Sequence, residues 1–122
     1  MSFTMADFRK LVVWQKANLL SVATVEAVDG IRGNSGSILR GQILRSTFSI
    51  QANIAEGSSK QSDREFARYI RIALGSTTES ANHVILMRDL GLIDETRFTS
   101  LDTKLDEVGK MLSGLVKRLQ DA

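Results

Sequence analysis

The sequence predicts an all-α protein folded as an antiparallel up-down-up-down four-helix bundle, with residues 1–122 forming a single domain. Three observations support this prediction. Glycine and serine clusters divide the chain into four long segments, and apolar residues recur within these segments every three or four positions. Alternation of apolar and polar residues with a period of two is sustained nowhere, and the chain has no proline to interrupt a helix.

The first two helices are expected at about residues 4–28 and 37–57. Thr4, with Asp7 three residues later, resembles a capping box with a shorter acid. Gly57 is a residue type that favours the left-handed conformation at a helix end. Residues 30–36 (GIRGNSG) follow a helix and lack the Gly-Lys-Ser/Thr ending of a phosphate-binding loop, so we interpret them as a helix connection.

The third helix is expected at residues 62–90, and the fourth at residues 94–120. The third begins with a capping box from Ser62 to Glu65 and stops at Gly91. Both helices carry an apolar or small-residue stripe at helical spacing. The stripe of the third consists of Phe66, Tyr69, Ile70, Ala73, Thr77, Ser80 and Val84, and that of the fourth of Phe98, Leu101, Leu105, Val108, Leu112, Leu115 and Leu119.

The second helix has two apolar strips separated by a polar seam. One strip contains Leu39, Ile43, Ile50 and Ile54, and the other contains Leu44, Phe48, Ala52 and Ala55. A helix that is apolar on two sides of a four-helix bundle is expected to face both the core and a second subunit. The alternative interpretation is a single wide and imperfect core face.

The polar seam is expected to be partly buried and therefore hydrogen-bonded. Its members are Gln42, Arg45, Ser49, Asn53 and Glu56. The favoured interpretation is an inter-helix network in which Arg45 and Glu56 find partners, with Glu65 and Glu79 of the third helix as candidates. The alternative is a small-ligand or acid/base site formed by Arg45, Asn53 and Glu56, but the sequence offers no matching nucleophile–base pair.

Metal and cofactor chemistry are not expected. His83 is the only histidine and follows Glu79 by four residues, whereas a dimetal carboxylate bundle uses Glu-x-x-His spacing on two helices. The chain has no cysteine, which excludes thiolate metal sites and cysteine nucleophiles and agrees with a reducing cytoplasm. We therefore expect a protein without enzymatic activity.

Four basic residues are candidates for nucleic-acid binding: Lys60, Arg64, Arg68 and Arg71. The three arginines lie along one side of the third helix and could contact phosphates, although such a stripe is commonly a solvated face. The net charge of +2 is small, so the patch gains strength only when several copies share it in an oligomer. Apolar runs are too short for a membrane span, and we expect a cytoplasmic protein.

The sequence resembles the bacterial four-helix bundle protein family, also called the 23S ribosomal RNA intervening-sequence proteins. The resemblance is carried by residues 49–57 (SIQANIAEG), 64–69 (REFARY) and 72–79 (IALGSTTE), with residues 7–17 (DFRKLVVWQKA) and 90–93 (LGLI) also similar. Two features depart from the family pattern. The first connection is glycine-rich where proline and aromatic residues are frequent, and Gln51 stands where proline is common.

The resemblance implies an up-down four-helix bundle that assembles as a ring-like homopentamer and has no enzymatic activity. The family is similar to the accessory variability determinant proteins of diversity-generating retroelements, which bind nucleic acid and a reverse transcriptase through a basic surface. The resemblance therefore favours RNA or DNA as a partner through the repeated arginines. The alternative that it leaves open is an adaptor or scaffold for a protein such as a reverse transcriptase, without direct contact to nucleic acid.

Overall fold

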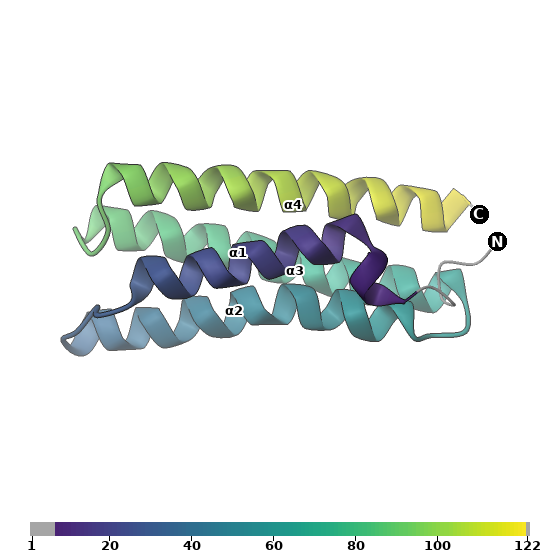
Figure 1. Cartoon of the computed structure of the whole chain (residues 1–122), viewed down its shortest axis with the longest axis horizontal. Coiled ribbons are helices and arrows are strands. Elements are labelled where there is room, and N and C mark those ends of the chain that lie inside the picture. Colours follow the sequence, from purple (N-terminus) through teal and green to yellow (C-terminus); the bar gives the residue numbers. More distant parts are fainter. Residues whose placement is uncertain (1–6, 122) are drawn as a thin grey trace.

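The computed structural model describes residues 7–121 as a short 3₁₀ helix followed by four long α-helices. The elements are η2 (Phe8–Lys10), α1 (Val12–Val28), α2 (Asn34–Ser58), α3 (Asp63–Asp89) and α4 (Glu95–Asp121). Consecutive helices run antiparallel, and each packs against two neighbours, with α1 closing the bundle against both α2 and α4 (Figure 1). The predicted up-down-up-down four-helix bundle is confirmed.

The first helix does not run unbroken from residue 4 to residue 28 as predicted. Leu11 adopts an extended conformation (φ −74°, ψ 124°) between η2 and α1, so the α-helix begins only at Val12. Asp7 caps the 3₁₀ helix, because its carboxylate accepts a hydrogen bond of 3.0 Å from the backbone N–H of Arg9. Thr4, the predicted cap, lies outside the described residues.

Helix α2 is longer than predicted at both ends. It begins at Asn34 within the glycine-rich connection and continues through Gly57 to Ser58. Gly57 is therefore not a left-handed terminal residue, and its value lies in close packing. A Cβ atom at Gly57 would lie 2.7 Å from Cβ of Tyr69 and 2.9 Å from Cδ1 of Phe66, which is closer than van der Waals contact allows.

The signals predicted for α3 agree with the structure, and α4 begins within one residue of the predicted start at residue 94. The Ser62 side chain accepts a hydrogen bond of 3.1 Å from the Glu65 amide, and Asp94 accepts one of 2.8 Å from the Arg97 amide. Gly91 has a φ of +74° and donates to the carbonyl of Arg88, while the next residue donates to Met87. This pair of bonds is a Schellman motif, which favours glycine.

The core contains the stripes predicted from helical periodicity. Phe66 and Ile70 of α3 and Leu112 of α4 are fully buried, and the predicted α4 stripe is buried throughout except at Phe98, which is partly exposed. The Phe98 ring instead packs under the Arg88 guanidinium, 4.2 Å from its centroid. Within the described residues, no helix has the length and apolar character needed to cross a membrane.

Candidate functional site

The two apolar strips of α2 face different environments. Leu39, Ile43, Ile50 and Ile54 are buried in the bundle core. In contrast, Phe48 is 44% exposed, and it lines a shallow groove of about 520 Å³ between α1 and α2 together with Val22 and Val25. At the groove, Gln51 donates a hydrogen bond of 3.0 Å to Asn18 of α1. In the second strip Phe48 and Ala52 are exposed, whereas Leu44 packs against the core, so only part of this strip lies outside the core.

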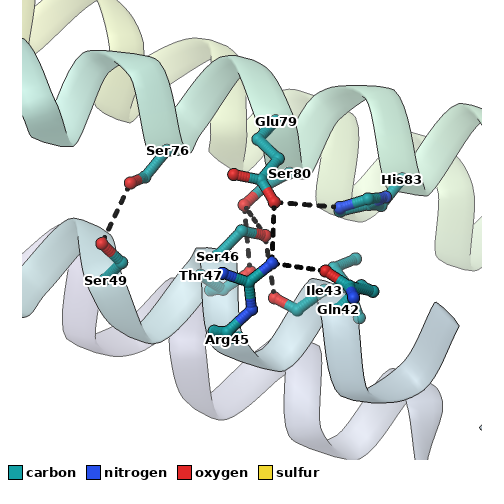
Figure 2. A network of polar contacts seen from close by, with 10 residues as sticks. All are labelled: Gln42, Ile43, Arg45, Ser46, Thr47, Ser49, Ser76, Glu79, Ser80 and His83. Carbon is teal, nitrogen blue, oxygen red and sulfur yellow. Dashed lines mark hydrogen bonds and ion pairs between the residues drawn. The ribbon is translucent and has the colours of Figure 1, made fainter. Parts of the chain in front are cut away.

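Part of the polar seam forms the predicted network between α2 and α3 (Figure 2). The Arg45 guanidinium donates to Gln42 Oε1 and lies 3.5 Å from the Glu79 carboxylate. Nε2 of His83 lies 3.3 Å from the same Glu79 oxygen, so this α3 carboxylate contacts Arg45 of α2 and His83 of its own helix. The side chains of Arg45 and Glu79 are 69% and 43% exposed, and such a solvated pair contributes about 0–1 kcal/mol.

The other seam residues do not converge on one point. Asn53 donates to the carbonyl and hydroxyl of Ser49, and the Ser76 hydroxyl reaches the same Ser49 hydroxyl at 3.0 Å. Glu56 is exposed, and its carboxylate lies 3.8 Å from Nζ of Lys60 in the turn that follows α2. The expected burial is therefore wrong for Arg45 and Glu56, because the seam lies at the edge of the α2–α3 interface.

The buried polar centre of this interface consists of hydroxyl groups that the seam did not include. Ser80 of α3 lies 2.8 Å from the Ser46 hydroxyl and 3.3 Å from the Thr47 hydroxyl of α2, and all three side chains are buried (Figure 2). Their small size lets the two helices approach closely. A run of Ser and Thr at core positions of both helices is the sequence signal for such a contact.

The basic cluster, defined as Lys60, Arg64, Arg68 and Arg71, lies at the bundle end that carries the α2–α3 turn. Two of its members contact the ring of Tyr69, with Arg68 4.6 Å and Lys60 5.1 Å from the centroid. The Arg68 guanidinium also pairs with Glu65 at 3.2 Å, which raises the pKa of Arg68. Glu65 is thus a partner within α3 and not for the seam.

The antiparallel fold distributes charge unevenly along the bundle. The end with the α2–α3 turn, formed by residues 7–16, 54–72 and 112–121, contains nine Lys or Arg and five Asp or Glu, a net charge of +4. The rest of the chain contains seven basic and nine acidic residues, a net charge of −2. The small overall charge of +2 therefore hides a basic end.

Among the described residues, no group of three or more His, Asp or Glu side chains is arranged to hold a metal ion. His83 is mostly buried, with 13% of its side chain exposed, and its Nε2 atom contacts the Glu79 carboxylate. The structure thus places His83 in the inter-helix network.

Comparison with known proteins places this fold in a family. The family model of the 23S rRNA-intervening sequence proteins matches residues 9–114, which includes the seam, the hydroxyl contact and the basic cluster. The chain belongs to the 23S rRNA-intervening sequence protein family.

A structural relative supports the same assignment. The crystal structure of a protein of unknown function from the S23 ribosomal protein family of Bacteroides thetaiotaomicron superposes with a TM-score of 0.79 and 28% sequence identity. The match covers 86% of this chain and 98% of the relative. No protein with a curated description matches the chain. In this 23S rRNA-intervening sequence protein, the basic end and the apolar α1–α2 groove are two surfaces whose composition is suited to binding a partner.

Proposed function

We propose that the protein is a non-catalytic, cytoplasmic, homo-oligomeric nucleic-acid-binding protein, which assembles as a pentamer and binds RNA or DNA through the basic cluster. The observation that carries this proposal is the net charge of +4 at one end of the bundle. Phosphate contacts dominate the affinity of proteins for nucleic acids, and a symmetric ring multiplies a modest patch by the number of subunits.

The surroundings of the cluster support a nucleic-acid ligand. Tyr69 is partly exposed between two cations, Lys60 and Arg68. Aromatic rings and guanidinium planes stack with unpaired bases, while the adjacent cations contact the backbone. Arg64 and Arg71, two turns apart on α3, extend the same surface toward the end of α4, where a pocket of about 360 Å³ is also lined by Leu119.

Self-association is the second part of the proposal and rests on the α1–α2 groove. Val22, Val25 and Phe48 are each more than 40% exposed around it, and a contiguous apolar surface of this kind is typical of an interface. The same groove favours the alternative function, a scaffold for a protein partner such as a reverse transcriptase, in which nucleic acid is not bound directly.

A salt titration of binding to an RNA hairpin tests the nucleic-acid role. A variant with Arg64→Gln, Arg68→Gln and Arg71→Gln is expected to lower the slope of log affinity against log salt by about 2, since each phosphate contact contributes about 0.7–0.9. The matched control carries Arg32→Gln, Arg97→Gln and Lys104→Gln at the opposite end of the bundle, and it should keep the wild-type slope. Equal slopes for both variants would contradict the proposal.

A further inference from the structure

A second basic site lies in a pocket between the start of α1 and the last turns of α4. We propose that this α1–α4 pocket binds a nucleoside phosphomonoester, either as a free nucleotide or as the phosphorylated end of a nucleic-acid strand. The pocket has a volume of about 430 Å³, within the range of small-molecule sites. It shares no residue with the basic cluster, so the two proposals can fail separately.

The charge of the pocket wall selects an anion. Three of its lining residues are basic, namely Lys10, Lys110 and Arg118, and none is acidic. Lys110 pairs with Asp106 at 3.0 Å, whereas Lys10 and Arg118 have no ion pair among the described side chains. A phosphomonoester carries a charge of about −1.5 to −2 at neutral pH and offers three strong acceptor oxygens, which suits converging Lys and Arg donors.

The floor of the pocket selects the group that carries the phosphate. It is formed by apolar side chains, with Val13 and Leu115 buried and Leu11 and Met111 partly buried. Methionine adapts its shape and makes favourable sulfur contacts with aromatic rings, which suits a nucleobase. Val13 and Leu115 belong to the core, so the pocket floor is continuous with the bundle interior.

Gly114 lines the pocket, and the absence of a side chain at this position leaves space between the apolar floor and the basic side chains. A Cβ atom at this position would meet only Nη1 of Arg118, at 3.9 Å, so the Arg118 guanidinium lies beside an unfilled position on the helix. A larger residue at position 114 would occupy the pocket without a backbone clash. This geometry supplies a blocking variant that does not depend on charge.

Binding of adenosine 5′-monophosphate, followed by amide chemical shifts and by calorimetry, tests the site. We expect saturable shifts at residues 10–13 and 110–118. Adenosine, which lacks the charged phosphate, should bind with an affinity about tenfold or more below that of adenosine 5′-monophosphate. Lys10→Gln with Arg118→Gln should weaken binding about tenfold, while Lys117→Gln, an exposed neighbour that does not line the pocket, should change it less than about twofold. If both variants lost the same amount of affinity, the loss would reflect the overall charge of the protein and not contacts in the pocket, and the proposed site would be wrong.

Two further arms complete the experiment. Gly114→Leu should abolish binding, whereas Gly75→Leu, which adds the same side chain at an open position on α3, should preserve it and report on folding. An oligonucleotide with a 5′-phosphate is compared with its 5′-hydroxyl form. Preference for the phosphorylated strand over the free nucleotide identifies a strand end as the ligand, and equal affinity identifies the nucleotide. Absence of saturable binding by every phosphorylated probe would overturn the proposal.

Discussion

The hydroxyl groups of Ser46 and Ser80 lie 2.8 Å apart across the α2–α3 interface, and both side chains are almost completely buried. Ser46 also donates to the carbonyl of Ile43, and Ser80 reaches Thr47 at 3.3 Å, so neither hydroxyl depends on a single partner. A buried polar contact of this kind contributes to stability only while its groups stay paired. The Ser46–Ser80 contact connects α2, which lines the apolar α1–α2 groove, with α3, which carries the three arginines of the basic cluster.

Ser46→Ala and Ser80→Ala are each expected to reduce the free energy of unfolding by about 1 kcal/mol, the usual net value of a buried hydrogen bond. The double variant should lose less free energy of unfolding than the sum of the two single variants. Either single substitution already removes the Ser46–Ser80 hydrogen bond, so the second cannot remove it again. Urea denaturation of the four proteins in the cycle measures the coupling. Ser37→Ala, at an exposed position of α2, is the control, and strictly additive losses would contradict the predicted coupling.

Gly57→Ala should destabilise the protein, although alanine is the better helix former. The added methyl group would lie 2.7 Å from Cβ of Tyr69, which is fixed to the α3 backbone, so the two helices must separate. We expect a loss of about 1–3 kcal/mol from overpacking. Gly41→Ala on the same helix meets no atom within 4 Å and should stabilise by about 0.5–1 kcal/mol. Thermal unfolding of both variants checks the opposite signs.

Asp7 is expected to remain ionised at unusually low pH. Hydrogen bonds from Arg9 lower the pKa of Asp7 from 3.8 to about 2. Because the carboxylate is favoured in the folded state, its stabilising contribution is complete above the unfolded pKa near 4 and is lost as the pH falls through about 2. Between pH 5 and 8 this group should cause no change in stability.

A carboxyl-detected NMR titration measures the Asp7 midpoint directly. Arg9→Gln should raise it toward 3.8, since the charged donor is removed. Arg32→Gln, in the connection between α1 and α2 at the other end of the bundle, should leave it unchanged. A wild-type midpoint near 3.8 would show that the Arg9 contact does not persist in solution.

Phe48→Asp should disrupt the proposed self-association without unfolding the subunit. The Phe48 side chain is 44% exposed at the α1–α2 groove, so the isolated bundle loses little packing, whereas an interface there would have to bury a carboxylate. Light scattering after size exclusion should give a wild-type mass several times 13.4 kDa and a smaller mass for the variant. Ile38→Asp, exposed on α2 but outside the groove, is the matched control. A monomeric wild-type protein would contradict the proposed assembly.

The sequence by itself determined the helices and their buried faces, because caps and apolar periodicity act within about one turn of the chain. Ser62 and Gly91 bracket α3, and the apolar stripe of α4 is buried from Leu101 onward, as its spacing predicts. The local break at Leu11 was missed because residues 7–17 lack a glycine or proline that would signal it.

Only the tertiary structure decided which distant residues meet. Glu79 contacts Arg45 across the interface, but Glu56 pairs with Lys60 in the turn after α2 and Glu65 pairs with Arg68 on its own helix, because small rotations of each helix decide which long side chains reach across. Gly57 proved to be a packing residue, since its neighbour Tyr69 belongs to another helix. The basic end and the α1–α4 pocket likewise arise from the antiparallel arrangement, which brings Lys10 and Arg118 together from opposite ends of the chain.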